Sequence, residues 1–424
     1  MNHQPSDYAG GGLELASEPY ARLRLFPVCQ MGGFMLKKVF PHRRDRMILL
    51  PVIGSQLIVM TSMFLMPVII DALELHAGLS AKAAGLLLSM ELAVSALTTL
   101  SLSSWVRPHS ARRWALAGGL LTIVATALTL ISPALPALFA TRLLAGVGAG
   151  VVGAEATSVL SLGADRERLI AILTITSIID AAFWLAVLPY LIDRFGYRAP
   201  YACLLLICLC STFLLQRLPS HSARQHSTGP ALRAPFSFSA LLVVIAVFLT
   251  QLGQGAFWSM EERYGSFAGF NSHAIGMILS ASTMLLLLGA VGAACAGNRF
   301  GRYNSLLIVI ALNAFSILLV STIAVHWVYL AANILQAVTN LSAVIYQLGL
   351  AAFLDRGGRV VAVSTALVTL GNGIGPGLAA SLSAVFGVPF IGVLVLAINC
   401  LALALYGAVK LRGAADAQLS ASTA

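Results

Sequence analysis

The sequence consists largely of long apolar runs, each about the length of a membrane-spanning helix and separated from the next by a short polar joint. A bilayer core is about 30 Å thick, so a helix needs about 20 apolar residues to cross it. Of the 424 residues, 58% are hydrophobic and 10% are charged, whereas soluble domains contain about 25% charged residues. The chain is therefore predicted to be an all-α, polytopic membrane protein.

The apolar runs predict twelve transmembrane helices in two groups of six. The expected spans are 48–70, 80–102, 114–132, 135–160, 169–190, 199–217, 237–260, 272–297, 303–323, 327–353, 361–384 and 387–408. The stretch 218–236 is polar, contains proline and has no apolar period, which is typical of a linker. We thus expect an N-terminal tail (1–47), a first six-helix bundle (48–217), the linker (218–236), a second bundle (237–408) and a C-terminal tail (409–424).

Short segments of the first group are repeated in the second. The sequence AGLLLS at 84–89 is matched by IGMILS at 275–280, and SSWVRPHSARRW at 103–114 is matched by AACAGNRFGRYN at 293–304. Both pairs lie at corresponding places, around the second span of each group. The repeat predicts two pseudo-symmetric six-helix bundles, an arrangement typical of transporters.

The basic residues are distributed unevenly between the two sides of the predicted membrane. Of the 26 Lys and Arg residues, only Lys82, Arg194, Arg198 and Arg263 fall in the loops on one side, and Arg142 lies inside a span. All others fall in the tails, the linker and the loops on the opposite side. Cytoplasmic loops are enriched in Lys and Arg, so both termini are expected in the cytoplasm and the protein in the inner (plasma) membrane. The net charge of +10 is then explained by topology and contact with anionic lipid, and a nucleic-acid partner is not expected.

Two motifs resemble the major facilitator superfamily, and the resemblance extends over about residues 48–408. In the second half, Asn298-Arg299-Phe300-Gly301-Arg302 matches the family's basic loop motif between its second and third spans, with Asn where Asp is usual. In the first half the motif is degraded to Arg112 and Arg113. The fourth span carries the family's Arg followed by alternating glycines, here Arg142, Gly146, Gly148 and Gly150. The resemblance implies that the basic loops hold helix ends together in one conformation; the alternative is that they are ordinary cytoplasmic loops. The candidate gating residues are Arg112, Arg113, Asn298, Arg299, Gly301 and Arg302.

Polar side chains share helix faces inside four of the spans. Asn333, Gln336, Asn340 and Gln347 fall within one narrow stripe, because neighbours on a helix are about 100° apart. A stripe of amides cannot face lipid, so these faces are predicted to line a cavity, although amides also join helices to one another. The expected substrate-binding residues are Arg142, Gln251, Gln254, Trp258, Asn333, Gln336, Asn340 and Gln347.

Two acidic residues lie near the middle of predicted spans. Charged side chains within a membrane are costly and are functional candidates by default. Asp180 and Glu91 are therefore candidate proton-coupling residues, with a fixed ion pair to Arg142 as the alternative. The glycines at 146, 148 and 150, and the run from Gly371 to Gly377, are expected where helices approach closely or bend.

Taken together, these features predict a secondary active transporter that binds a small organic solute and protons in a bilayer, as a monomer. Symport of an organic acid is preferred, and proton-driven efflux of amphipathic or drug-like compounds is the close alternative. The rival from another class is a non-transporting membrane sensor or a membrane enzyme. The sequence contains no phosphate-binding loop, zinc-spaced His/Glu set or nucleophile beside a histidine, so neither a cofactor nor a metal site nor enzymatic activity is expected.

Overall fold

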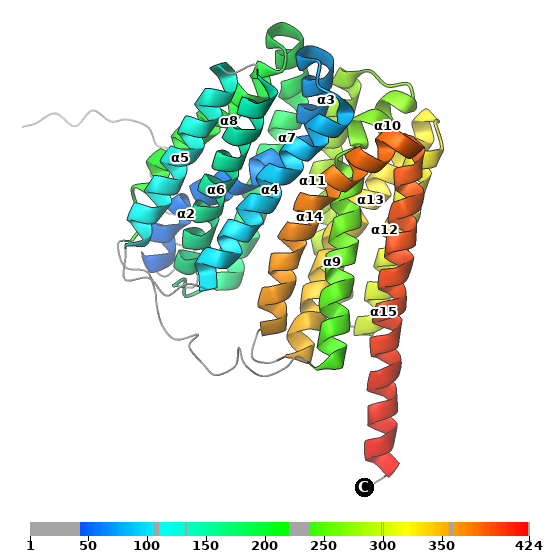
Figure 1. The fold of residues 1–424 in the computed structure, drawn as a ribbon. Coiled ribbons are helices and arrows are strands. Elements are labelled where there is room, and N and C mark those ends of the chain that lie inside the picture. Colours follow the sequence, from blue (N-terminus) through cyan, green and yellow to red (C-terminus); the bar gives the residue numbers. More distant parts are fainter. Residues whose placement is uncertain are drawn as a thin grey trace, which may run out of the picture.

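The computed structural model describes residues 43–104, 110–131, 134–160, 162–219, 237–297, 299, 301–355 and 359–422. Within these ranges the chain is helical and contains no β-strand. The linker predicted over 218–236 lies outside the described residues except for residues 218 and 219. Figure 1 shows the helices arranged as two bundles side by side, α2 to α8 in one and α9 to α15 in the other.

The first half contains seven helices. They are α2 (Arg43–Phe64), α3 (Met66–Ala77), α4 (Ala81–Ser104), α5 (Ala111–Ile131), α6 (Leu135–Leu160), α7 (Arg166–Phe195) and α8 (Arg198–Leu215). The second half follows the same plan. Its helices are α9 (Phe238–Trp258), α10 (Glu261–Phe267), α11 (Ser272–Ala296), α12 (Arg302–Thr322), α13 (His326–Leu354), α14 (Arg359–Phe386) and α15 (Val388–Ser422).

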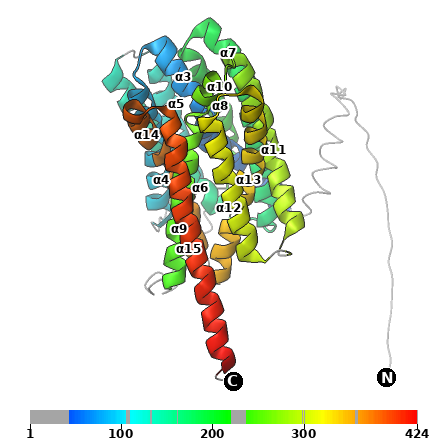
Figure 2. The same ribbon diagram turned by 90° about the vertical axis from the view of Figure 1, so that its right-hand side faces the viewer.

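Twelve helices in the described part of the chain are long and apolar enough to cross a membrane. This confirms the expected fold class, an all-α polytopic membrane protein with twelve spans. The remaining two, α3 and α10, are short helices that follow the first span of each half. At the C-terminus, α15 continues as helix to Ser422, well beyond residue 408 where the last span was expected to end. Figures 1 and 2 both show α15 extending past the other helices.

The first predicted span, 48–70, is wrong beyond Phe64. Helix α2 ends there, and α3 begins at Met66 with Pro67 in its first turn. Proline lacks a backbone N–H and is accommodated in the first turn of a helix, where no intrahelical bond is lost. Hydropathy could not reveal this break because the residues on both sides of it are apolar. The second half has a similar break, between Trp258 and Glu261.

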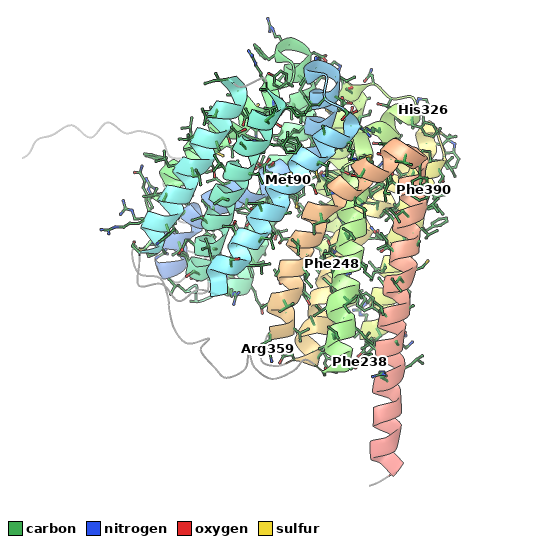
Figure 3. The ribbon with its side chains drawn as sticks, in the orientation of Figure 1. Met90, Phe238, Phe248, His326, Arg359 and Phe390 are labelled. Atoms are coloured by element: carbon green, nitrogen blue, oxygen red, sulfur yellow. The ribbon has the colours of Figure 1, made fainter. Side chains whose placement is uncertain are left out.

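The bundle has two distinct ends. We call the end that carries α3 and α10 the short-helix end, and the end from which α15 extends the terminal end. Figure 3 shows His326 at the short-helix end and Phe238 and Arg359 at the terminal end. The basic residues near the ends of the spans are unevenly divided between these two ends of the bundle. At the short-helix end the described helices carry Lys82, Arg194, Arg198 and Arg263, and at the terminal end they carry Arg46, Arg112, Arg113, Arg166, Arg168, Arg302, Arg359, Lys410 and Arg412.

Three helix pairs join the two halves. Helix α4 packs against α14, α7 against α11, and α3 against α10. Ser89 on α4 donates a hydrogen bond of 2.6 Å to the backbone oxygen of Gly373 on α14. Ser280 on α11 donates one of 2.6 Å to the backbone oxygen of Ala182 on α7. These contacts lie near mid-span or toward the short-helix end, so the halves are closed against each other there.

Candidate functional site

A cavity lies between the two halves. The free space there, counted together with the open solvent that it meets, is about 480 Å³. Its lining combines amides and hydroxyls with apolar groups and contains no ionisable side chain. The lining residues are Met63 and Phe64 from the first half, and Gln254, Trp258, Ser282, Thr283, Leu286, Gln336, Ala337, Asn340 and Asn372 from the second. The site is therefore uncharged, with one polar and one apolar part.

Two of the lining amides have an atom without a protein partner. Gln254 and Gln336 are both buried, and neither Gln254 Oε1 nor Gln336 Nε2 has a hydrogen-bond partner in the described part of the chain. A buried polar atom left unpaired costs about 1–3 kcal/mol. Both atoms have almost no accessible surface, so they are unpaired inside the protein, and other atoms of the two side chains face the cavity.

Asn372 is held by a chain of hydrogen bonds that leads away from the cavity. Its Nδ2 donates to the backbone oxygen of Val368 and to Gln251 Oε1, both at 2.9 Å. Gln251 Nε2 donates to Gln347 Oε1 at 3.1 Å, and Gln347 Nε2 donates to Thr250 Oγ1 at 2.7 Å. Because a backbone oxygen can only accept, the bond to Val368 fixes which way the Asn372 amide is turned. Its Oδ1 is therefore the atom left available to the cavity.

Trp258 connects the cavity to the break between α2 and α3. Its Nε1 lies 3.2 Å from the backbone oxygens of both Met63 and Phe64. These are the last residues of α2, and carbonyls at a helix end have no intrahelical partner. The side chain that ends α9 in the second half thus donates to the carbonyls that end α2 in the first half.

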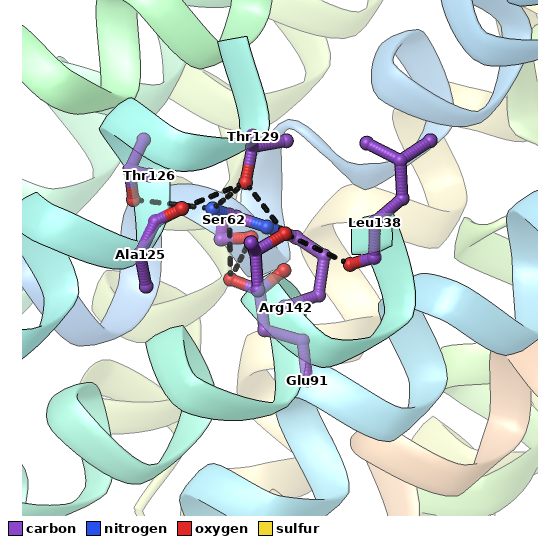
Figure 4. Close-up of polar contacts among 8 residues, drawn as sticks. Ser62, Glu91, Ala125, Thr126, Thr129, Leu138 and Arg142 are labelled. Atoms are coloured by element: carbon purple, nitrogen blue, oxygen red, sulfur yellow. Dashed lines mark hydrogen bonds and ion pairs between the residues drawn. The ribbon is translucent and has the colours of Figure 1, made fainter. Parts of the chain in front are cut away.

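Arg142 lies inside the first half and is not among the residues that line the cavity. Its side chain is 1% exposed. Its Nη2 donates to Thr129 Oγ1 at 2.7 Å and to Thr126 Oγ1 at 3.3 Å, while Nη1 lies 3.6 Å from Glu91 Oε1. Figure 4 shows this cluster. The guanidinium also lies over the ring of Tyr201, 4.9 Å from its centroid, so Arg142 links α6 to α4, α5 and α8.

The two candidate proton-coupling residues are both hydrogen-bonded within the first half. Ser62 Oγ donates to Glu91 Oε1 at 3.2 Å, whereas Glu91 Oε2 has no partner among the described residues. Thr61 Oγ1 donates to Asp180 Oδ2 at 2.8 Å, and Trp184 Nε1 donates to Asp180 Oδ1 at 3.1 Å. Glu91 is fully buried, whereas Asp180 is partly exposed. The alternative ion pair foreseen for Arg142 forms with Glu91.

The structure places the eight expected substrate-binding residues in four regions. Gln254, Trp258, Gln336 and Asn340 line the cavity. Gln251 and Gln347 lie behind it, in the amide chain. Asn333 is buried and donates to the backbone oxygen of Tyr329 at 3.1 Å, and Arg142 belongs to the first-half cluster. A shared helix face identified the right helices but could not distinguish a residue at the cavity from one packed behind it.

Six lining residues with polar or large apolar side chains were not among the expected set: Met63, Phe64, Ser282, Thr283, Leu286 and Asn372. Asn372 was hidden within the glycine run of the eleventh span, which indicated helix packing. Ser282 and Thr283 follow Ser280 in an otherwise apolar stretch of α11, a signal that could have been used.

The candidate gating residues lie at the terminal end. Arg112 and Arg113 are exposed at the start of α5, and Arg299 is exposed just before α12. Gly301 caps α12 with a φ of 80°, a conformation that favours glycine. Arg302 begins α12 and lies over the ring of Phe353, 4.3 Å from its centroid. Asn298 lies outside the described residues. Their role in gating stays a prediction.

The glycines that follow Arg142 mark close helix contacts, which confirms the expectation from sequence. A Cβ on Gly146 would lie 2.4 Å from the backbone oxygen of Glu91 on α4, and one on Gly148 would lie 2.6 Å from the backbone oxygen of Gly118 on α5. Positions two apart point to nearly opposite sides of a helix. The alternating glycines therefore let α6 approach α4 on one side and α5 on the other.

Comparison with known proteins bears on the fold and the family. The sequence model of the Major Facilitator Superfamily matches residues 52–260. The structure is similar to that of a bacterial homolog of the human lysosomal transporter Spinster, solved in an inward-facing and unoccupied conformation, with a TM-score of 0.65 and 13% identity over 86% of this chain and 96% of that one. It is also similar to a D-xylose-proton symporter, with a TM-score of 0.65 and 15% identity over 85% of this chain and 96% of that one. No curated protein sequence matches the chain.

Proposed function

Since this chain belongs to the major facilitator superfamily and is a transporter of that family, we propose that it moves a small, neutral organic solute by alternating access, together with protons. The observation that carries the proposal is the cavity between the halves, whose lining comes from both and contains no ionisable side chain. In transporters built from repeats, the substrate site lies near mid-membrane where the repeats meet. The cavity occupies that position.

The lining favours a solute with hydroxyl or amide groups on one side and an apolar surface on the other. Gln254, Gln336 and Asn372 line the cavity and supply its amide groups. Trp258, Phe64 and Leu286 supply the apolar part. A solute with hydroxyl or amide groups can form hydrogen bonds with these amides, whereas an anion would find no charged partner among the lining residues.

The organic acid expected from the sequence is the alternative substrate. An organic acid would need a positively charged group at the cavity. Arg142 is the cationic residue among the expected substrate-binding residues, and it is already paired with Glu91. Binding of an acid would require that pair to separate. Efflux of amphipathic compounds is a further alternative, supported by the apolar part of the lining.

Proton coupling is supported by buried acids in the first half and by the similarity of the fold to a D-xylose-proton symporter. Glu91 and Asp180 stay the candidate proton carriers within the spans. The uneven distribution of Lys and Arg supports an inner (plasma) membrane location with the terminal end in the cytoplasm. In that orientation the short-helix end faces outward and is closed.

The proposal can be tested with the full-length protein in lipid vesicles and an imposed pH gradient. Radiolabelled pentoses, hexoses, polyols, small organic acids and amphipathic cations would be offered in turn. We expect accumulation of at least one neutral solute, driven by the gradient and abolished by a protonophore. Gln336→Leu should weaken it by about tenfold or more, since one lost hydrogen bond is worth about 1–3 kcal/mol.

The matched control is Gln216→Leu, which replaces an exposed amide at the end of α8 and should leave uptake unchanged. Accumulation of acids alone would favour the organic-acid alternative. Gradient-driven expulsion of amphipathic cations alone would favour efflux. If no compound of any class moves with the gradient, proton-coupled transport is wrong.

A further inference from the structure

The short helix α10 carries two buried carboxylates outside the membrane-spanning segments. Glu261 is 0% exposed and Glu262 is 3% exposed. Neither is held by a hydrogen bond of normal geometry from the described residues. An ionised carboxylate in such a place loses its hydration without compensation. Both side chains are therefore poorly accommodated in their charged form.

The two acids have different surroundings. Glu261 faces into its own half, toward Tyr329 and Asn333 on α13. Glu262 lies on the side of α10 that packs near α3 of the other half, where the charge of Asp71 acts on it. Like charges that meet in a partly dehydrated interface repel each other strongly. The contact between α3 and α10 thus brings two carboxyl groups from opposite halves near each other.

The guanidinium group of Arg263 supplies positive charge at this interface. Arg263 on α10 forms an ion pair with Glu74 on α3 and also lies near Asp71. Arg263 is already paired with Glu74. Its positive charge therefore only partly neutralises the other carboxyl groups at this interface, Asp71 and Glu262. The interface has more acid than base.

The other titratable groups around Glu262 can be named helix by helix. On α3, His76 lies near Asp71, and its positive charge, when present, lowers the pKa of the Asp71 carboxyl group. On α10, Tyr264 is buried. On α11, Ser272 lies beside Glu262, and His273 is bonded at 2.8 Å to Asp193 of α7. On α13, His326 packs against Phe270, with ring centroids 4.6 Å apart.

The pKa values agree with the geometry. Burial and the nearby Asp71 raise the pKa of Glu262 to about 8. Burial raises the pKa of Glu261 to about 8 as well, and burial raises that of Asp71 against the opposing effect of Arg263. When α3 and α10 separate, Glu262 would regain water and lose its acidic neighbour, which returns its pKa toward the ordinary value near 4.5.

We propose that Glu262, near Asp71 of the other half, is a proton-binding site whose occupancy closes the short-helix end. The inference rests on the proposed alternating-access function and adds a second proton site outside the central cavity. With the proton bound, Glu262 is neutral, so its burial at the contact between α3 and α10 is tolerated and the halves can meet. Without it, two carboxylates oppose each other and closure is disfavoured.

The direction of the pH dependence follows from linkage. The closed form binds the proton more tightly than the open form, so lowering the pH stabilises the closed form. Between pH values of about 4.5 and 8, the closed form is protonated while the open form is ionised. In this window the closed-to-open ratio should change by up to about tenfold per pH unit for one proton. Above about pH 8 the dependence should level off.

The test is a distance measurement that needs no solute. Spin labels would be attached to Phe195→Cys on α7 and Val385→Cys on α14, both exposed at the short-helix end and on opposite halves, in a chain whose native cysteines are replaced by alanine. Double electron–electron resonance in lipid nanodiscs from pH 5 to 9 would report the closed and open populations. We expect the open population to grow as the pH rises, and Glu262→Gln to remove this dependence and stay closed.

Three further variants make the result specific. Glu261→Gln lies on the same helix but faces its own half, so it should keep most of the dependence. Glu167→Gln, at an exposed position at the terminal end, should behave like the unsubstituted chain. Asp71→Asn removes the nearby charge and should move the midpoint to lower pH, which gives a second test if Glu262→Gln does not fold.

A pH-independent distance in the parent chain, or an unchanged profile in both Glu262→Gln and Asp71→Asn, would overturn the inference. Transport measurements in vesicles separate this outcome from failure of the proposed function. Proton-driven solute uptake with pH-independent distances would leave the function standing and remove this site. A pH-dependent distance without transport of any compound would support this proton site and contradict the proposed transport function.

Discussion

Arg142 on α6 lies 3.6 Å from Glu91 on α4, and both side chains are buried within the first half, away from the central cavity. The arginine of the fourth span therefore joins helices through an ion pair and two threonines. Its place beside alternating glycines follows from the same contact, because Gly146 lets the backbone of Glu91 approach α6.

Removing either member of this pair should destabilise the first half. Glu91→Gln or Arg142→Met leaves a buried charge without its partner, which costs about 3–5 kcal/mol. The double variant removes both charges, so its loss should be clearly smaller than the sum of the two. Thermal unfolding of the three variants in detergent measures this. Losses that simply add would show that the pair is not coupled, and unchanged stability in Glu91→Gln with loss of proton coupling would favour a coupling role for Glu91.

Two glycine substitutions should have opposite effects. A Cβ at Gly146 would lie 2.4 Å from a backbone oxygen, whereas one at Gly349 on α13 would meet no atom within 4 Å. Gly146→Ala must therefore separate α4 from α6 and should lower the unfolding temperature. Gly349→Ala should raise stability slightly, by about 0.5–1 kcal/mol, because alanine loses less entropy in a helix. Equal effects of the two substitutions would contradict the close packing of α6.

The hydrogen-bond chain behind the cavity should act on solute binding from a distance. Gln347→Leu removes the acceptor of Gln251 and the donor to Thr250 without changing any lining residue. We expect a loss of stability of about 1–3 kcal/mol and a KM for the transported solute that rises several-fold, because Asn372 loses its fixed orientation. A KM equal to that of the unsubstituted protein, measured in vesicles, would show that the chain serves packing alone.

Asp180 can be tested directly as a proton carrier. Asp180→Asn keeps one acceptor oxygen, which can accept from Trp184, and an amide N–H that can donate to the Thr61 hydroxyl, but it cannot bind or release a proton at neutral pH. Gradient-driven accumulation should be lost while solute exchange without a gradient continues. Accumulation that persists in this variant rules out Asp180 as the carrier, and loss of both activities indicates a structural role.

The architecture could be predicted because membrane thickness sets the length of every span, and the apolar runs record that length directly. The break after Phe64 could not, since the sequence stays apolar through Ile70 and only Pro67 marks it. The short helices α3 and α10, and the acidic interface between them, were hidden for the same reason. The acidic interface forms only because the ends of two helices from different halves meet, and hydropathy does not show which helix ends meet.

The site could be predicted in part. Helical periodicity places Gln254, Gln336 and Asn340 on faces that avoid lipid, and all three line the cavity. The same periodicity cannot tell a face that meets the cavity from one that meets another helix, which is why Gln347 and Arg142 were grouped with them. Asn372 was missed because its glycine neighbours carried the stronger signal, that of close helix packing.

The central claim is that a neutral solute and protons move together through the cavity between the halves. It is tested most directly by trapping a pH-sensitive dye inside vesicles that contain the full-length protein, and adding the solute identified by uptake outside, without an imposed gradient. We predict that solute entry acidifies the interior in the unsubstituted protein and in Gln216→Leu, and much less in Gln336→Leu. Solute entry with no change of internal pH, or with a rise, would contradict proton symport.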